Sequence, residues 1–227
     1  MAYGDLVSCL CVTRNRVALL RRAVQCFLRQ TYSQKELIVL YESDDIATRY
    51  FVAQLNEPSI LAIEVSAIPR LTLGSLRNLA VRVSRGNYVA QWDDDDWHGP
   101  ARLEEQMSAL ETHDRPGCVL LRWLLYDEVT HKAMVSHTRA WEGSLLARRD
   151  AMPLYADLPK FEDTPAVTSM LNEDKLVGLD RPDLYVYTYH GANTWERSHW
   201  DQQIAGFATP LNDEDTEQVR NALYGAA

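Results

Sequence analysis

Several features that would assign this chain to other protein classes are missing from its 227 residues. Lysine and arginine (23) are outnumbered by aspartate and glutamate (32), which gives a net charge of −9 and disfavours bulk nucleic acid as a partner. No apolar run is long enough to span a bilayer, and Met1–Ser8 lacks a basic segment followed by an apolar one. We therefore expect a cytoplasmic protein with no transmembrane segment. Peripheral attachment to the inner face of the membrane stays open.

Paired cysteines and glycine-rich phosphate loops are also absent. The four cysteines, at positions 9, 11, 26 and 118, form no CxxC pair, so no zinc site is expected. Cys9 and Cys11 alternate within a strand-like run and should point the same way, as reduced core residues. Neither GxGxxG nor GxxxxGK followed by Ser or Thr occurs. This disfavours a nucleotidyltransferase or phosphohydrolase that relies on an early phosphate loop.

Apolar runs alternate with helical periodicity through the first hundred residues. Strands are predicted at 6–12, 36–41, 61–65 and 88–92, and helices at 17–30, 46–55 and 73–83. This order predicts an α/β fold with a mainly parallel, doubly wound sheet flanked by helices. The composition, 46% hydrophobic and 24% charged, is that of an ordinary globular domain, and we treat 1–227 as a single domain.

The pattern changes after Pro100. Helices are predicted at 101–110 and 166–171, and strands at 118–126, 131–136 and 184–189. The acidic stretch from Asn212 is either helical or frayed. The chain thus divides into a regular half, about 1–97, and a less regular half, about 98–227.

Four consecutive aspartates, Asp93–Asp96, follow the predicted strand at 88–92. Polar clusters also follow two other strands, at Thr13–Asn15 and Glu42–Asp45. In a parallel sheet all three clusters meet at the carboxyl edge, where open α/β sheets bind their ligands. Adjacent carboxylates repel one another unless they bind protons or a cation, and oxygen ligands suit Mg²⁺ or Mn²⁺. The alternative, a solvated acidic turn, is disfavoured by the flanking Trp92 and Trp97.

Together these motifs resemble family 2 glycosyltransferases with the GT-A fold, over roughly Leu6 to Trp195. The segments that carry the resemblance occur in the family's order: Val7–Arg16, Phe27–Tyr32 with Glu36–Val39, Leu76–Ala80, Gly86–Val89 leading into the DxD-like Asp93–Asp96, and Phe161–Asp163. The resemblance implies a metal-dependent, inverting transfer of a sugar from a nucleotide-diphosphate donor, expected to be a UDP-sugar. The hydroxyl acceptor would be a glycan, a lipid-linked sugar, a peptide or a small molecule. Residues 1–97 would bind the donor, and residues 98–227 would bind the acceptor and supply the catalytic base.

The resemblance also assigns roles to individual residues. Asp93 and Asp95 match the DxD carboxylates that contact the ribose and hold the divalent ion, Mn²⁺ or Mg²⁺. His190 could complete the metal site, while Asp96 is a further contact and Asp94 lies on the nucleotide side or faces solvent. The other nucleotide contacts would be Thr13, Arg14, Asn15, Glu42 and Arg77. Glu42 stands where relatives have an aspartate that contacts uracil. A donor with a nucleotide base other than uracil therefore stays possible.

Asp163 is the candidate catalytic base. An inverting transfer needs one carboxylate to take the proton of the acceptor, and by resemblance Asp163 takes this role rather than Glu162, which would be structural or face the acceptor. Asp163 could instead only cap the helix that starts at Thr164-Pro165.

Structural alternatives also apply to other predicted site residues. Thr13 and Asn15 could cap the first helix, and Arg77 could be a surface residue. His190 could be structural, and Trp141 belongs either to the core or to an acceptor wall. Two other functions stay open: a catalytically silent sugar-nucleotide-binding protein and a metal-dependent nucleotidyltransferase.

Overall fold

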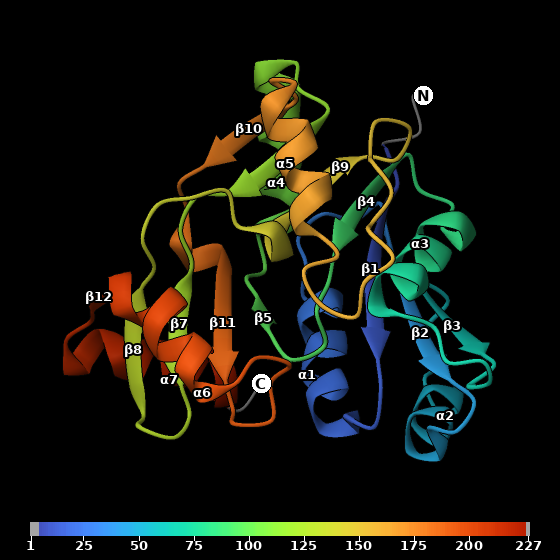
Figure 1. Ribbon diagram of the computed structural model, residues 1–227, viewed down its shortest axis with the longest axis horizontal. Coiled ribbons are helices and arrows are strands. Elements are labelled where there is room, and N and C mark those ends of the chain that lie inside the picture. Colours follow the sequence, from blue (N-terminus) through green and yellow to red (C-terminus); the bar gives the residue numbers. More distant parts are fainter. Residues whose placement is uncertain (1–4, 226–227) are drawn as a thin grey trace.

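The computed structural model describes residues 5–225, which form two β-sheets with helices packed around them (Figure 1). The larger sheet has the strand order β10-β6-β9-β4-β1-β2-β3, and every pairing in it is parallel except those of β9. Its strands are β1 (Val7–Thr13), β2 (Lys35–Glu42), β3 (Ile60–Val65), β4 (Tyr88–Gln91), β6 (Gly117–Leu120), β9 (Leu146–Arg148) and β10 (Leu176–Leu179).

The smaller sheet is mixed and comes almost entirely from the second half of the chain. Its order is β12-β8-β7-β11-β5, with β11 parallel to β7 and the other pairs antiparallel. Its strands are β5 (Trp97–His98), β7 (Leu124–Asp127), β8 (Lys132–Val135), β11 (Tyr185–Tyr189) and β12 (Thr209–Pro210).

Helices cover both faces of the larger sheet. The longer ones are α1 (Val17–Leu28), α2 (Ile46–Ala53), α3 (Leu73–Val83), α4 (Arg102–His113), α5 (Thr164–Asn172) and α7 (Asp213–Tyr224). Short helical turns are η1 (Glu142–Ser144), η2 (Pro182–Leu184), α6 (Arg197–His199), η3 (Trp200–Ile204) and η4 (Ala205–Phe207). Side chains of α1, α2 and α4 pack with one set of alternate β1 residues, and α3 packs with the other set. Because β1 is buried on both sides, it is apolar almost throughout, and the predicted doubly wound α/β fold is confirmed.

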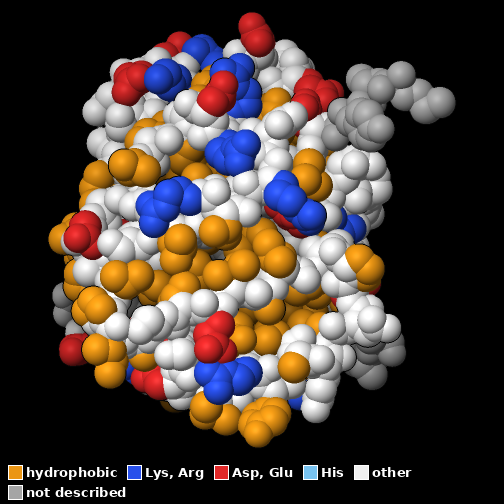
Figure 2. All heavy atoms as spheres, turned by 90° about the vertical axis from the view of Figure 1, so that its right-hand side faces the viewer, with side chains coloured by type: hydrophobic (Ala, Val, Ile, Leu, Met, Phe, Trp, Pro, Cys, Tyr) orange, Lys and Arg blue, Asp and Glu red, His pale blue; other side chains and the backbone are white. Residues whose placement is uncertain are grey.

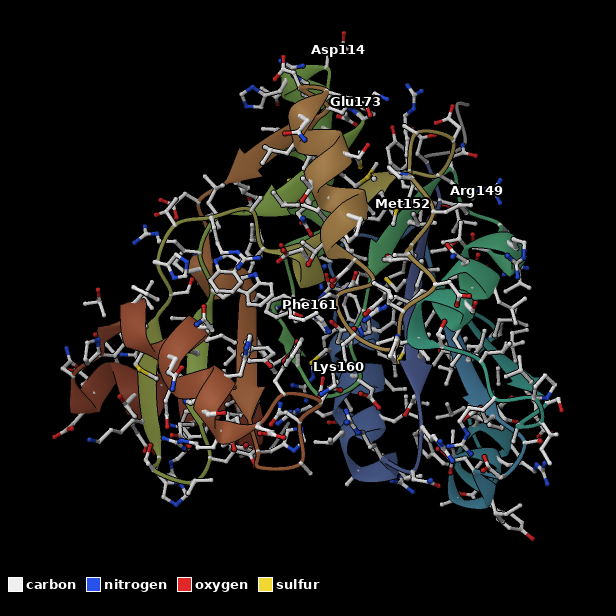
Figure 3. The ribbon with its side chains drawn as sticks, in the orientation of Figure 1. Asp114, Arg149, Met152, Lys160, Phe161 and Glu173 are labelled. Carbon is white, nitrogen blue, oxygen red and sulfur yellow. The ribbon has the colours of Figure 1, made fainter. Side chains whose placement is uncertain are left out.

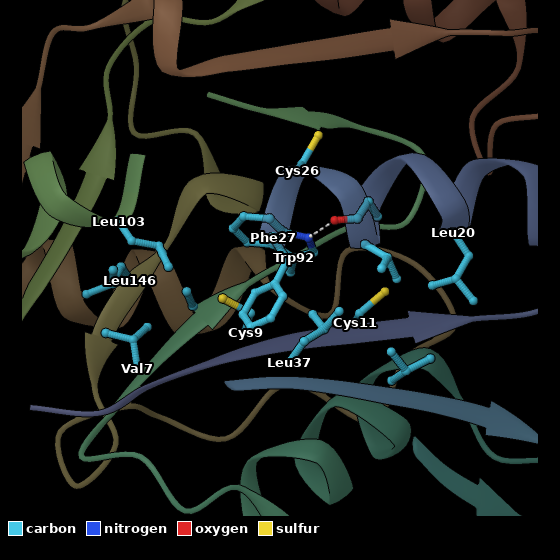
Figure 4. Packing of buried hydrophobic residues seen from close by; sticks show 14 of the residues in the cluster. Val7, Cys9, Cys11, Leu20, Cys26, Phe27, Leu37, Trp92, Leu103 and Leu146 are labelled. Atoms are coloured by element: carbon cyan, nitrogen blue, oxygen red, sulfur yellow. Dashed lines mark hydrogen bonds between the residues drawn. The ribbon is translucent and has the colours of Figure 1, made fainter. Parts of the chain in front are cut away.

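The core beneath α1 contains all four cysteines. Cys9 and Cys11 point to the same side of β1, as predicted, and pack with Phe27 and Trp92 (Figure 4). All four cysteines are free and buried, and burial raises the pKa of the Cys9 thiol to about 12. A thiol that stays protonated at neutral pH behaves as a small apolar side chain, so these residues serve packing.

One strand prediction in the second half is wrong. The run 118–126 is not a single strand: it divides into β6 of the larger sheet and β7 of the smaller one. The chain changes sheet between them, at Arg122, which pairs with Asp180 at the surface. An apolar run shows that a segment is buried, but it does not show in which sheet.

Several short elements have no clear signal in the sequence. The strands β5, β10 and β12 were not predicted, and β10 extends the larger sheet beyond β6. The predicted division at residue 97 does not separate the sheets, since β6, β9 and β10 of the second half complete the larger one. Of the two readings of the C-terminal stretch, the helical one is correct. Asn212 caps α7 by accepting a hydrogen bond from the Asp215 N–H at 2.8 Å.

The β3 edge of the larger sheet is partly exposed. Hydrophobic side chains gather in the middle of this face of the molecule, with lysine and arginine side chains above them (Figure 2). Exposed apolar residues of this region include Ile46 and Tyr50 of α2, Leu61 of β3 and Ile68 in the loop after it. Among residues 5–225, no helix combines the length and apolar character needed to cross a membrane.

We expect Glu36→Gln to lower the free energy of unfolding by about 1.5–3 kcal/mol, because charged hydrogen bonds are lost from a buried group. Glu36 is 1% exposed and accepts hydrogen bonds from Ser8 Oγ (2.7 Å) and from Arg85 N (2.8 Å) and Nε (2.6 Å). Burial by itself would raise the pKa of Glu36, but these hydrogen bonds bring it below its ordinary value of 4.5.

The advantage of Glu36 over glutamine should therefore be complete above about pH 4.5 and disappear as the pH falls through the folded-state pKa. Urea unfolding of both proteins at pH 7 and in mild acid measures this difference. Glu64→Gln is the control, because Glu64 pairs with Arg49 at the surface and should contribute less than about 1 kcal/mol. Equal stabilities of wild type and Glu36→Gln at pH 7 would show that the charged hydrogen bonds to Glu36 do not stabilise the fold.

Candidate functional site

The carboxyl ends of β1, β2 and β4 open into one cavity of about 920 Å³. Its walls also include α3, the segment 139–143, the loop 159–164 and residues that follow β11. Lys160 and Phe161 of this loop lie near the middle of the molecule, between the two sheets (Figure 3). The three polar clusters that were predicted to meet at this edge all reach the cavity, through Thr13 and Arg14, through Glu42 and through Asp93–Asp96.

The four aspartates are held by the protein, and the alternative of a solvated acidic turn is wrong. The prediction that Asp94 might face solvent is also wrong: it is 4% exposed and accepts a hydrogen bond from Thr13 Oγ1 at 2.6 Å. Burial and the neighbouring Asp95 raise the pKa of Asp94 to about 7. Asp96 also lines the cavity, but its two oxygens accept hydrogen bonds from Tyr185 Oη and Thr188 N of the smaller sheet.

Neither Thr13 nor Asn15 caps the first helix. Helix α1 begins after Arg16 and has no side-chain cap. Thr13 instead binds Asp94, and the Asn15 N–H donates to Asp45 Oδ2 at 2.6 Å, which joins the β1 loop to the start of α2. Thr13 lines the cavity, whereas Asn15 is not among the residues that line it.

Arg77 is a buried residue, so the alternative of a surface arginine is wrong. Its side chain is 6% exposed, and its Nη2 lies 2.7 Å from Asp93 Oδ1 while its Nε lies 2.8 Å from Glu162 Oε1. Its remaining nitrogen, Nη1, is buried without a hydrogen-bond partner. Arg77 therefore joins the acidic cluster to the Glu162-Asp163 segment and leaves one donor for a ligand. It also fixes Glu162 in a structural position.

Asp163 occupies the N-cap position of α5, but its side chain makes no capping hydrogen bond. The alternative that Asp163 only caps this helix is therefore wrong. Its Oδ2 accepts a hydrogen bond from Gln91 Nε2 at 3.1 Å, and the same nitrogen donates to Asp93 Oδ2 at 3.2 Å. Gln91, the last residue of β4, thus holds the candidate base beside the first aspartate of the cluster. Gln91 was not predicted as a site residue, although a polar residue in a buried strand close before the aspartates was a usable signal.

A second carboxyl group, Glu142, lines the cavity near Asp163 and was also missed. It accepts a hydrogen bond from Thr164 Oγ1 at 3.3 Å and pairs with Arg139. Burial raises its pKa, Arg139 opposes the shift, and the charge of Asp163 adds to it. The adjacent Trp141 is 4% exposed and stacks on Trp123, so it belongs to the core while one part of it reaches the cavity.

The two predicted metal ligands lie next to each other. Asp95 Oδ2 is 3.4 Å from His190 Nε2, and the side chains are 14% and 8% exposed. Asp95 lines the cavity. His190 is not among the lining residues, and its side chain contacts the aspartate cluster at Asp95. Burial would raise the pKa of Asp95, but the hydrogen bond from His190 and the charge of Arg16 lower it below its ordinary value.

Within residues 5–225, no three His, Cys, Asp or Glu side chains are grouped so that they could hold a metal ion alone. Mg²⁺-type sites commonly use one or two carboxylates together with substrate phosphates and water. The Asp95–His190 pair fits a shared site of this kind, in which substrate oxygens supply the remaining ligands. It does not fit a preformed protein cage.

A buried carboxylate between two arginines closes the β2 end of the cavity. Glu42 is 3% exposed, and its Oε2 lies 3.3 Å from Arg14 Nε while its Oε1 lies 4.0 Å from Arg70 Nε. All three residues line the cavity. Glu42 Oε1 and Arg14 Nε have no hydrogen-bond partner, so this group can still accept and donate hydrogen bonds.

Comparison with known sequences yields one family and one curated relative. The family described as Glycosyl transferase family 2 matches residues 8–169. WcaA of Escherichia coli (strain K12), provisionally named a colanic acid biosynthesis glycosyl transferase, is 29% identical over 166 residues. The match covers 70% of this chain and 52% of WcaA, so the chain spans about half the length of that relative.

Solved structures with the same architecture include two nucleotide-sugar complexes. TarS 1–349 of S. aureus in complex with UDP-GlcNAc has a TM-score of 0.67 at 14% identity, over 96% of this chain and 65% of that one. The mannosyltransferase PcManGT of Pyrobaculum calidifontis, in complex with GDP-Man and Mn²⁺, has a TM-score of 0.58 at 15% identity. That match covers 87% of this chain and 60% of the mannosyltransferase. At these identities the likeness concerns the fold, and it confirms the predicted GT-A architecture.

Proposed function

Because this chain belongs to glycosyl transferase family 2, we propose that it is an inverting, metal-dependent glycosyltransferase. The donor would be a nucleotide-diphosphate sugar, and the acceptor would be a hydroxyl group, such as one on a growing glycan. The observation that carries the proposal is the pairing of Asp163 and Asp93 on the single nitrogen of Gln91, within one cavity that also contains Asp95. This arrangement brings a candidate base next to a candidate diphosphate site.

In the proposed reaction, Asp163 accepts the proton of the acceptor hydroxyl as its oxygen attacks the anomeric carbon. The bond between that carbon and the phosphate oxygen breaks, the nucleoside diphosphate leaves, and the configuration at carbon inverts. Arg77 and Gln91 keep Asp93 and Asp163 in position through the contacts described above. A divalent ion bound by Asp95 and His190 would stabilise the charge that develops on the diphosphate.

The acceptor half of the cavity suits a sugar ring. Trp141, Phe161 and Trp195 line it, and the rings of Phe161 and Trp195 contact each other, with their centroids 4.3 Å apart. Flat apolar faces next to polar groups such as Glu142 are what a carbohydrate needs, since sugars carry both C–H faces and hydroxyl groups. We therefore favour a glycan acceptor.

The Arg14–Glu42–Arg70 group favours uracil as the base. The three side chains present a donor, an acceptor and a donor in order. Uracil offers the complement on one edge, with O4, N3–H and O2. Guanine instead places two donors, N1–H and N2–H, side by side and so matches this order less well.

Glu42→Gln should raise the KM for the donor and the Kd for UDP by about 10–100-fold, since charged hydrogen bonds contribute about 1.5–3 kcal/mol. At saturating donor, kcat should stay close to wild type, because base binding is the same in the ground state and the transition state. Calorimetry with UDP and steady-state rates measure the two effects.

The matched control for this change is Asp44→Asn. Asp44 pairs with the same two arginines at 3.1 Å each, but it is half-exposed and is not part of the cavity lining. Its affinity for UDP should remain within about threefold of wild type. A Glu42→Gln enzyme with an unchanged donor KM would remove Glu42 from the base site.

A screen of nucleotide sugars with Mn²⁺ or Mg²⁺ tests the function itself. The proposal expects metal-dependent release of a nucleoside diphosphate, and UDP-sugars should give the highest rate. A catalytically silent binding protein would bind UDP without turnover, and a nucleotidyltransferase would pass on the nucleotidyl group and release a sugar 1-phosphate instead of a nucleoside diphosphate. If neither UDP nor GDP binds in the presence of Mn²⁺, the proposal is wrong.

A further inference from the structure

Arg16 places a positive charge inside the acidic cluster. It is the N-cap residue of α1, three positions after the end of β1, and it lines the cavity with its side chain 28% exposed. Its Nη1 lies 2.8 Å from Asp95 Oδ2 and 3.5 Å from Asp94 Oδ1. Its Nη2 donates to the carbonyl oxygen of Ala192 at 3.3 Å, in the loop that follows His190. One guanidinium group thus contacts two carboxylates and the loop of the second candidate metal ligand.

The contact to Asp95 competes with metal binding. Asp95 Oδ2 is the oxygen that faces both Arg16 Nη1, at 2.8 Å, and His190 Nε2, at 3.4 Å. A divalent ion between Asp95 and His190 would lie next to the guanidinium group, and two cations in contact repel each other. Either the ion binds weakly, or Arg16 moves away from Asp95.

A diphosphate would give Arg16 another anion to bind. Its partial exposure leaves the side chain free to turn within the cavity, where the donor diphosphate would lie beside Asp95. Guanidinium groups bind phosphate oxygens well through paired N–H donors. The charge of Arg16 is then neutralised by the diphosphate instead of by Asp95, and Asp95 becomes free for the ion.

We propose that Arg16 is an internal cation that holds Asp95 in the free protein and releases it to the metal only when the nucleotide diphosphate binds. The inference rests on the proposed function, because it takes Asp95 and His190 as the metal ligands. Metal and nucleotide then bind with positive coupling, and Arg16 contributes part of that coupling. Since coupling is reciprocal, the ion strengthens nucleotide binding by the same factor.

The test measures Mn²⁺ affinity with and without UDP by the loss of the free-ion electron paramagnetic resonance signal. Arg16→Gln should bind Mn²⁺ alone about tenfold more tightly than wild type, because a competing charge within a few ångströms is gone. The coupling factor, which is the ratio of the Mn²⁺ Kd values without and with UDP, should fall about tenfold. Arg16→Met, which keeps the aliphatic stem, serves as a second charge-removing variant if Arg16→Gln does not fold.

Two control variants separate this role from a general charge effect. Arg16→Lys keeps a cation and should keep the weak binding of Mn²⁺ alone. Arg14→Gln removes the same charge from the same loop, but Arg14 pairs with Glu42 and Asp44. Its affinity for Mn²⁺ alone should change less than threefold.

The outcomes distinguish the inference from the proposed function. If the folded Arg16→Gln protein binds Mn²⁺ with wild-type affinity and wild-type coupling to UDP, the internal-cation role is overturned while the glycosyltransferase proposal stands. If wild type binds Mn²⁺ no better with UDP than without it, the shared metal site is wrong and the role of Arg16 is overturned with it.

Discussion

Asp163→Asn is expected to lower transfer to the acceptor by about 10²–10⁴-fold, the usual contribution of a positioned general base. Affinity for UDP and for Mn²⁺ should remain near wild type, because no partner of Arg77 or Asp95 is changed. The fold should also survive, since the Asp163 side chain makes no capping hydrogen bond and asparagine can still accept one from Gln91. The measurement is kcat for transfer, together with the Kd for UDP and the melting temperature of the same variant.

Glu142→Gln is the matched comparison for Asp163→Asn. Both residues line the acceptor side of the cavity, but Asp163 shares Gln91 with Asp93, whereas Glu142 is paired with Arg139, so Glu142 is the weaker candidate for the base. Its substitution should change mainly the KM for the acceptor. A folded Asp163→Asn enzyme with transfer within a few-fold of wild type would sink the base assignment. A large loss of kcat in Glu142→Gln would then move the role to Glu142.

The outline of the site could be predicted because strand ends in a parallel sheet converge by topology. Apolar periodicity was enough to place β1, β2 and β4, and α3 was predicted with its observed bounds. Once the strands are parallel and adjacent, the residues after them must meet at one edge. The positions of Glu42 and Asp93–Asp96 on one cavity follow from that geometry.

The partners of each side chain could not be predicted, because they depend on rotamers and on packing between distant segments. Arg77 was predicted to contact the nucleotide, with a surface position as the alternative, since nothing in its own helix shows that it lies between Asp93 and Glu162. For Asp94 the solvent reading was wrong, because the residue is buried against Thr13, which lies 81 positions earlier. Arg16 and Gln91 were overlooked for the same reason, because each acts through contacts to residues from other elements.

Short strands that are stabilised only by pairing with distant segments could not be predicted from the sequence pattern either. The two-residue strand β5 exists through its pairing with β11, and β10 through its pairing with β6. Short strands of this kind carry too few residues for a period to be recognised. The division of 118–126 between two sheets is a property of the fold that local composition does not determine.

Asp95→Asn should lower turnover by about 10²–10⁴-fold, because Lewis-acid stabilisation of a leaving diphosphate is worth several kcal/mol. The substitution removes one charged metal ligand and with it the ion pair to Arg16 at 2.8 Å. The activity that remains should respond little to Mn²⁺ concentration, and Mn²⁺ binding in the presence of UDP should weaken by at least about tenfold. Rates over a Mn²⁺ titration and the resonance signal of the free ion measure these effects.

Asp96→Asn is the matched control, since it alters the neighbouring carboxyl group of the same cluster. Asp96 is 1% exposed, and burial together with the charges of Asp95 and Asp93 raises its pKa well above its ordinary value. Its hydrogen bonds go to Tyr185 and Thr188, away from the Asp95–His190 pair. We therefore expect Asp96→Asn to change the melting temperature more than the Mn²⁺ response. If Asp95→Asn keeps the wild-type rate and Mn²⁺ dependence while Asp96→Asn loses them, the metal ligand in this cluster is Asp96.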